Sequence, residues 1–338
     1  MKLYAGIDLH SSNNYLGIID EEDRRLFQKK LPNQLERILP VLEPFKKDLE
    51  GLVVESTYNW YWLVDGLMDQ GYKVHLAHPS AIKQYEGLKH VDDKWDSFWL
   101  AHMKRLNILP EGYIYPKEER PVRDLLRKRS FLVRQRTAHI LSFQSMVERV
   151  LGRRIKTNEI RKLKVEEVEQ LFEEEHQLLS GQIGISSIKF FNLQIREIEK
   201  VVKRRMKLNK SYQQLLTVPG IGYILALTIM LEVGDIRRFP TVGDFSSYCR
   251  CVGSRRISNG KVKGKGNSKN GNRYLSWAFV EAVQCAKRVS PKFKRYDQRK
   301  EAQRNNIVAV KALSNKLARA CYYIIRDQVP YREEGLFC

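Results

Sequence analysis

The sequence predicts an α/β domain followed by two mainly helical regions. Three observations support this fold class. Short strand-like and helix-like runs alternate over residues 1–117, no proline occurs between Pro121 and Pro219, and the remainder combines apolar helical segments with one glycine-rich turn region. We therefore expect an α/β domain at 1–117, a long helical or coiled-coil region at 118–212, and a mainly helical domain at 213–338.

The first region contains strand and helix patterns in a specific order. Three strands are predicted first, and alternating helices and strands follow them. This is the order of the ribonuclease H type of α/β domain, which we predict here. The strands are expected at 2–9, 15–19, 24–31, 51–55 and 73–77, and the helices at 34–47, 61–70 and 92–107.

Two long helices are expected in the middle region, at 122–151 and 182–207. The second carries apolar residues at near-heptad spacing, including Ile188, Ile195 and Val202. This stripe can pack within the chain or form a coiled coil with another subunit, and the pattern leaves both open.

The third region begins with Thr217-Val-Pro-Gly-Ile-Gly222 and continues into an apolar helix. This pattern is typical of a helix-hairpin-helix, in which glycines allow close backbone approach and the helix N-terminus binds a phosphate. Gly220 and Gly222 are therefore candidate nucleic-acid-binding residues. The alternative is a turn that only packs two helices.

The charge distribution favours a polyanionic partner. The 60 Lys and Arg against 39 Asp and Glu give a net charge of +21, which is unusual for a cytosolic metabolic enzyme. Residues 1–100 have 12 basic and 16 acidic side chains, whereas 101–338 have 48 and 23. Since each cation that neutralises a phosphate releases a counterion, nucleic acid is the expected partner.

Membrane insertion, export and structural zinc are not expected. No apolar run reaches the roughly 18 residues that span a bilayer. The N-terminus lacks a secretory pattern, and the five cysteines form no CxxC pair. We expect a cytoplasmic, nucleoid-associated protein.

Four acids could form a metal site. Asp8 and Glu55 lie at the ends of predicted strands, and Asp93 and Asp96 share one face of a predicted helix. Such hard oxygen ligands suit one or two Mg²⁺ ions that act on a scissile phosphate. Asp92 directly precedes Asp93, so either of these two residues could be the third acid.

A cationic segment, 253–273, contains no acid and is rich in glycine. We expect a mobile loop that becomes ordered on an anionic partner. Ser258 within it is a candidate nucleophile, with Ser254 and Ser268 as alternatives. The candidate DNA- or RNA-binding cations in or near the loop are Arg255, Arg256, Lys261, Lys263, Lys265, Lys269 and Arg273.

Together these motifs resemble the insertion-sequence DEDD transposases (insertion sequence 110 family), relatives of the Piv-type invertases and known as bridge-RNA-guided recombinases. The resemblance covers almost the whole chain. It is carried in the first region by Gly6-Ile-Asp8-Leu-His10, Val54-Glu-Ser-Thr57 and Asp93-Lys-Trp-Asp96-Ser97, and in the third by Pro219-Gly-Ile-Gly222, Ser258-Asn-Gly-Lys261 and Asn270-Gly-Asn-Arg273-Tyr-Leu275.

The resemblance implies an enzyme that cuts and rejoins DNA with a RuvC-like domain and a transposase domain. Asp8, Glu55, Asp93 and Asp96 would hold Mg²⁺, and Ser258 would form a covalent bond to a DNA phosphate. The implied partners are donor and target DNA, a noncoding guide RNA, and further copies of the chain in a dimer-of-dimers tetramer.

The chain departs from the family pattern at two positions. Asn259 stands where the first of two glycines usually follows the serine, and Tyr58 stands where a glycine commonly follows the Glu motif. We interpret both as variation, since the reactive groups are retained.

Two other functions compete with this one. A junction resolvase or nuclease would use the same acids with water as the nucleophile, and a non-catalytic scaffold would need none of them. An actin-like sugar kinase is set aside, because no glycine follows Asp8 in the run 9–14. The Arg-rich helix 123–136 and the cations at 153–164 are our expected RNA-facing surface.

Overall fold

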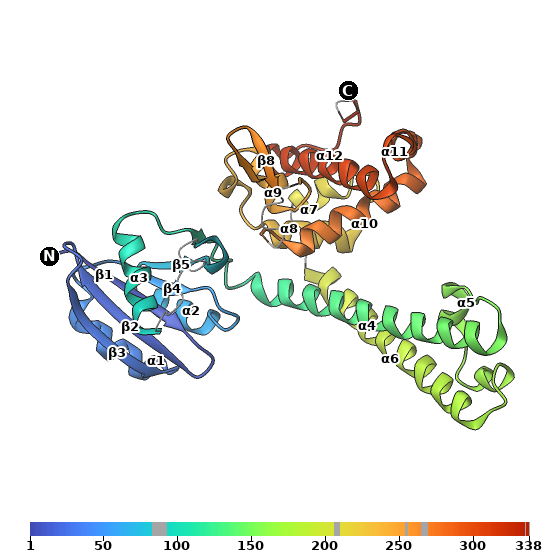
Figure 1. Ribbon diagram of the computed structural model, residues 1–338, viewed down its shortest axis with the longest axis horizontal. Helices are drawn as coiled ribbons and strands as arrows, with labels where there is room; N and C mark the ends of the chain where they lie inside the picture. Colours follow the sequence, from blue (N-terminus) through green and yellow to red (C-terminus); the bar gives the residue numbers. More distant parts are fainter. Residues whose placement is uncertain (83–92, 206–209, 254–255, 265–269, 335, 338) are drawn as a thin grey trace. The chain divides into compact units, whose positions relative to one another are not determined.

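The protein consists of two compact units, residues 1–117 and 118–338, in a computed structural model that describes residues 1–82, 93–205, 210–253, 256–264, 270–334 and 336–337 (Figure 1). Each unit is described by itself. Among the described residues, no helix has both the length and the apolar character needed to cross a bilayer.

Unit 1 is built on a mixed sheet of six strands in the order β3-β2-β1-β4-β5-β6. β1, β4 and β5 are parallel, and β2, β3 and β6 are each antiparallel to a neighbour. The strands are β1 (Leu3–Leu9), β2 (Asn13–Asp20), β3 (Arg25–Pro32), β4 (Leu49–Glu55), β5 (Val74–Ala77) and β6 (Glu111–Gly112). The five predicted strands are confirmed within two residues at each end, and the short β6 was not predicted.

Helices cover both faces of this sheet. On one face α1 (Leu35–Leu42) and α2 (Tyr61–Asp69) pack on alternate residues of the central strands, such as Ile7 and Val54. On the other face α3 (Asp93–Arg105) packs on the intervening residues. The helix expected at 34–47 is shorter than predicted, because it changes to a 3-10 turn at Glu43–Phe45, which contains Pro44.

Small residues allow α3 to approach the sheet closely. A side chain at Gly6 would collide with the backbone oxygen of Ser97, and one at Gly17 would lie 2.8 Å from Ser97 Oγ. The N-terminal turn of α3 is therefore held directly over β1 and β2.

Unit 2 begins with a helical hairpin. Helix α4 (Arg120–Leu151) begins with a proline in its first turn and ends at Gly152 with left-handed geometry, and α6 (Glu175–Arg205) packs beside it (Figure 1). The tip contains α5 (Thr157–Lys162) and η4 (Glu166–Gln170), which close a small core around Phe143 and Phe172.

The apolar stripe on α6 packs within the chain. Ile188, Ile195 and Val202 are each at most 4% exposed. A different set of large apolar residues on α6 is 47–59% exposed: Leu179, Ile183, Phe190, Leu193 and Val201.

A helical core completes unit 2. Its elements are α7 (Lys210–Leu215), α8 (Tyr223–Val233), η5 (Ile236–Arg238), α9 (Val242–Tyr248), the strands β7 (Arg256–Ser258) and β8 (Lys261–Gly264), α10 (Arg273–Val289), α11 (Pro291–Gln303) and α12 (Asn306–Asp327). Phe245, Phe279 and Phe293 are fully buried within it. Apolar residues at the ends of α4 and α6 pack against α8, which joins the hairpin to this core.

Candidate active site

Two candidate acids lie side by side at the carboxyl edge of the sheet in unit 1. Ile7 of β1 pairs with Val54 of the parallel strand β4, so Asp8 and Glu55 follow at the same level. Both belong to the face that α3 covers, and Asp8 is only 3% exposed.

The third acid approaches from α3. Asp96 is partly buried in the first turns of that helix, and its charge acts on Glu55. Asp93 begins α3, but the position of its side chain lies outside the described part of the chain, as does Asp92 altogether. The structure therefore places Asp8 and Glu55 side by side and Asp96 close enough for its charge to act on Glu55.

Crowding of these carboxylates changes the protonation of Glu55. Burial raises the pKa of Glu55 to about 8, and the hydrogen bond to Asp8 and the negative charges of Asp8 and Asp96 act in the same direction. A carboxyl with this pKa carries a proton at neutral pH unless a cation neutralises the group.

His10 belongs to the first motif of the chain, but no role was predicted for it. Its Nε2 lies 3.1 Å from Oδ2 of Asp8, and its ring makes an edge contact with Tyr15. Its carbonyl oxygen accepts hydrogen bonds from the side-chain amides of Asn33 and Asn59 at 2.9 and 3.0 Å. The signal in the sequence was a polar residue two positions beyond a strand-end acid.

The side-chain oxygens at this edge of the sheet are suitable ligands for a divalent cation. The group presents carboxylate oxygens, which are the hard ligands that Mg²⁺ prefers. Oδ2 of Asp8 is buried and has no hydrogen-bond partner of good geometry among the described residues. The described side chains do not include three potential ligands arranged to hold one metal ion. In this arrangement Glu55 is instead hydrogen-bonded to Asp8.

Ser258 lies on a β-hairpin in unit 2, and this corrects our expectation of a loop over residues 256–264 of the cationic segment. β7 and β8 pair antiparallel, with Ser258 opposite Lys261. The two residues between them, Asn259 and Gly260, have φ angles of 49° and 69°. A type I′ turn needs positive φ at both positions, and Asn-Gly is its preferred sequence. The Asn-Gly pair was thus a hairpin signal, and the expectation of a loop overlooked it.

The same geometry accounts for the departure at Asn259. Asn tolerates the left-handed region better than most residues, so it can replace a glycine there. Ser258, Lys261 and Lys263 are exposed on the hairpin. Arg256 is on β7, with its side chain outside the described part. The remaining predicted candidates, Arg255, Lys265, Lys269, Ser254 and Ser268, also lie outside the described residues.

The base of the hairpin segment is fixed to the core. Arg250 Nε donates to the carbonyl oxygen of Gly271 at 3.0 Å, and the Asn272 N–H donates to that of Tyr248 at 2.6 Å. A side chain at Gly271, where φ is 87°, would meet the Tyr248 oxygen. Residue 250, which precedes the cationic segment, and residue 271, near the end of the segment, are thus held together.

A buried ionic network beside this base was not predicted. Glu232 of α8 is 2% exposed, and it accepts hydrogen bonds from Arg123, Arg127 and Asn272. The Arg127 guanidinium also stacks over the ring of Tyr274 at 4.6 Å. The two arginines lower the pKa of Glu232 although burial acts against them. Helix α4 is thereby joined to α8 and to the start of α10.

Three arginines of the expected RNA-facing stretch of α4 form ion pairs inside unit 2, whereas Lys128 and Arg134 of that stretch are exposed. Arg123 and Arg127 bind Glu232, and Arg129 pairs with Glu199 at 2.6 Å. Their long side chains are used to join helices. The cations at the hairpin tip are also exposed: Arg153, Arg154, Lys156, Arg161, Lys162 and Lys164.

The glycines of the Pro219-Gly-Ile-Gly222 turn have different roles. Gly220 has φ of 84°, and a side chain there would collide with the backbone of Ala282 and Ala286 in α10. Packing therefore explains Gly220. Gly222 is the exposed N-cap of α8, has φ of −86°, and leaves open space around its Cα. Arg273 is also exposed, at the first turn of α10, and its guanidinium stacks on Tyr274.

Comparison with known proteins identifies the family. A family model described as transposase IS116/IS110/IS902 family matches residues 212–298, and the IS110-type DEDD transposase model matches residues 5–151. The chain belongs to the IS110 family of DEDD transposases. Both candidate centres of this IS110-family transposase, the acids of unit 1 and the Ser258 hairpin, lie inside matched regions.

Individual relatives agree. A probable family 20 transposase of Pseudomonas aeruginosa is 26% identical over 286 residues, which cover 80% of this chain and 82% of that protein. The transposase for insertion sequence element IS1328 of Yersinia enterocolitica is 33% identical over 140 residues, 39% of this chain and 40% of that protein. The transposase for insertion sequence element IS1111A of Coxiella burnetii is 28% identical over 142 residues, which cover 41% of this chain and 39% of that protein. The family implies DNA cleavage and joining with a divalent metal ion.

Proposed function

We propose that this transposase cuts and rejoins DNA with a two-part active site. The acids Asp8, Glu55, Asp93 and Asp96 bind Mg²⁺ in a RuvC-like domain at 1–117. Ser258 is the nucleophile in a transposase domain at 213–338. The helical region at 118–212 connects them.

One observation carries the metal-binding part of this proposal. Asp8 and Glu55 lie side by side at the carboxyl edge of two parallel strands, the charge of Asp96 acts on Glu55, and the pKa of Glu55 is raised to about 8. Like charges at that spacing are stabilised by a bound cation, whose chemistry is to neutralise charge on a phosphate and orient it. The strand order, in which three antiparallel strands precede two parallel ones, supports the ribonuclease H assignment.

The residues of this chain would divide the reaction as follows. Oγ of Ser258 attacks a DNA phosphorus, so that a Ser–O–P bond forms and the phosphorus–oxygen bond to one sugar breaks. A proton leaves the serine hydroxyl and one is added to the sugar oxygen. Attack by another sugar hydroxyl on the phosphoserine reverses the exchange and joins the strands. Exposed Lys261 and Lys263 on the adjacent strand would hold the DNA backbone.

We further propose donor and target DNA, a noncoding guide RNA and a tetramer as partners. The exposed cations at the tip of the α4–α6 hairpin suit an RNA backbone. The exposed apolar set on α6, Leu179 to Val201, supports assembly through this helix.

The test uses full-length protein, Mg²⁺, the RNA transcribed from the DNA beside the gene, and a plasmid with the element ends. We expect a protein–DNA adduct that survives SDS and recombinant product that depends on the RNA. Ser258→Ala should lose both, whereas the control variants Ser254→Ala and Ser268→Ala should retain both.

Other outcomes would favour the competing functions. Cleavage by Ser258→Ala without an adduct would indicate a nuclease or junction resolvase with water as the nucleophile. Asp8→Asn should abolish cleavage, and full activity of that variant would contradict the metal site.

A further inference from the structure

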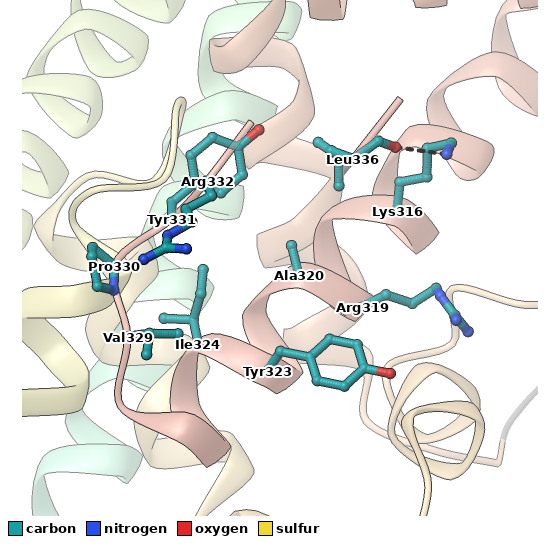
Figure 2. A pocket seen from close by; sticks show the side chains of 10 residues that line it. All are labelled: Lys316, Arg319, Ala320, Tyr323, Ile324, Val329, Pro330, Tyr331, Arg332 and Leu336. Atoms are coloured by element: carbon teal, nitrogen blue, oxygen red, sulfur yellow. Dashed lines mark hydrogen bonds between the residues drawn. The ribbon is translucent and has the colours of Figure 1, made fainter. Parts of the chain in front are cut away.

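A cavity of about 360 Å³ lies between the C-terminal half of α12 and the tail that follows it (Figure 2). Its apolar wall contains Ile324, Val329 and Pro330, and Tyr323 of α12 also lines the cavity. The side chains of Tyr323 and Val329 are each 40% exposed. The cavity belongs entirely to unit 2 and has no part in the active site described above.

The tail that forms one wall is fixed at several points. Gln328, which ends α12 in the left-handed region, donates to Ser211 Oγ at 2.7 Å. The N–H of Tyr331 donates to Thr217 Oγ1 at 2.8 Å, and Lys316 Nζ donates to the carbonyl of Leu336 at 2.7 Å. The cavity is therefore preformed, and its tail is bonded to the Thr217–Gly222 turn.

The charged side chains that line the cavity are all basic. Lys316, Arg319 and Arg332 line it, and no acidic side chain of the described chain does. Among the described residues, neither Arg319 nor Arg332 forms an ion pair, whereas the nearby Arg326 pairs with Asp327 and Lys292 with Glu333. Arg319 and Arg332 thus line the same cavity as Tyr323 and the apolar wall, and neither has a carboxylate partner in the part of the chain that the structure describes.

An aromatic ring, an apolar wall and arginine side chains around one cavity are typical of a site for an unpaired nucleotide. Proteins bind unpaired nucleotides by stacking the base on an aromatic or guanidinium plane while Arg or Lys contacts the phosphate. The ring of Tyr323 already has the Arg326 guanidinium at 4.8 Å from its centre. The cavity volume is at the lower end of the range for small-ligand sites and matches one nucleotide better than a duplex.

We propose that this cavity binds one unpaired nucleotide of a single-stranded nucleic acid. The base contacts Tyr323 and the apolar wall, and Arg319 and Arg332 contact the flanking phosphates. The site would hold a strand outside the active site, from either the guide RNA or a displaced DNA strand. Because binding needs no cleavage, it can be tested independently of the Ser258 mechanism.

The experiment measures binding of fluorescent twelve-residue oligonucleotides to the full-length protein in EDTA. We expect Tyr323→Ala to weaken binding of rU12, dT12 or both by about tenfold, since stacking depends on the ring. Tyr323→Phe should bind like wild type. Binding of an abasic oligonucleotide should be the same for Tyr323→Ala and wild type. Arg319→Ala with Arg332→Ala should reduce the salt dependence by up to about two charges, more than Arg304→Ala on an exposed loop.

Comparing rU12 with dT12 shows whether the bound nucleotide comes from RNA or from DNA. A larger loss with rU12 assigns the site to RNA, a larger loss with dT12 assigns it to a DNA strand, and equal losses support a site for either. Photocrosslinking of thiouridine-labelled RNA, or the thiothymidine-labelled DNA, should mark peptides within 319–332. Unchanged affinity of Tyr323→Ala for both oligonucleotides would overturn the proposal. The proposal would also be overturned if Tyr323→Ala changed the oligomeric mass of the protein but not its affinity for the oligonucleotides. The cavity would then hold a second copy of the chain.

Discussion

The side-chain amide of Asn272 donates a hydrogen bond to Oε2 of Glu232 at 2.7 Å, in the buried interior of unit 2. Through its Oδ1, Asn272 also caps the first turn of α10 by accepting from the N–H groups of Tyr274 and Leu275. Glu232 in turn binds Arg123 and Arg127 of α4. One carboxylate therefore links the helical hairpin to the base of the Ser258 segment.

Loss of this carboxylate should destabilise unit 2 strongly. Glu232→Ala leaves two arginines near the core without a counter-charge, and such changes cost about 3–5 kcal/mol. Urea unfolding followed by circular dichroism at 222 nm measures the change. The control is Asp327→Ala, which breaks an exposed pair with Arg326 and should change the stability far less. Equal effects of the two variants would show that the network contributes no more than a surface pair.

The stability of unit 1 should decrease with rising pH in the absence of metal. The folded-state pKa of Glu55 is about 8, against an ordinary value of 4.5, so the folded protein holds this proton more tightly than the unfolded chain. Below pH 4.5 both states are protonated. Between pH 4.5 and 8 wild type should lose stability relative to Glu55→Gln, by up to about 5 kcal/mol in all, since each pKa unit corresponds to about 1.4 kcal/mol.

Tryptophan fluorescence can follow this unfolding, since Trp60, Trp62, Trp95 and Trp99 lie in unit 1 and only Trp277 in unit 2. Mg²⁺ at pH 8 should stabilise wild type more than Glu55→Gln, because the cation offsets the ionised carboxylates. A constant difference between the two proteins from pH 4.5 to 8.5 would contradict the raised pKa.

The turn next to Ser258 should tolerate glycine but not a β-branched residue. Asn259 and Gly260 have positive φ, so Asn259→Gly should retain wild-type adduct formation with DNA. Gly260→Val should reduce it several-fold, because the branched side chain disfavours the φ of 69° and displaces the serine. Neither variant should change the thermal stability of unit 2 by more than about 1 kcal/mol, since the hairpin is exposed. Equal adduct formation by both variants would show that turn geometry does not position Ser258.

Substitution of the two glycines in the Thr217–Gly222 turn by alanine should have different effects on stability. Gly220→Ala should lower the thermal stability of unit 2, because its side chain meets the backbone of α10 and its φ is 84°. Gly222→Ala has open space and should fold normally, with at most a small capping loss. If the turn binds a phosphate, Gly222→Ala should weaken DNA binding. Normal binding by a stable Gly222→Ala would leave the turn with only its packing role.

Local patterns determined much of this protein. Period-two apolar runs, helical stripes and proline-free lengths were sufficient for the central strands and the long helices, because each depends on nearest neighbours in the chain. The same patterns placed Asp8 and Glu55 at strand ends, where parallel strands bring their termini together. The Asn259-Gly260 hairpin was also encoded locally, and its signal was interpreted as loop composition.

Tertiary structure decided which polar residues face each other. The pairing of β1 with β4 brought Asp8 beside Glu55, and the packing of α3 on the sheet brought Asp96 near Glu55; no spacing in the sequence contains those relationships. The arginines of α4 resemble a solvated surface in the sequence, and their buried partner Glu232 follows more than a hundred residues later. Short-range periodicity reports burial and secondary structure, whereas charge pairing, shifted pKa values and preformed cavities arise only when distant segments pack together.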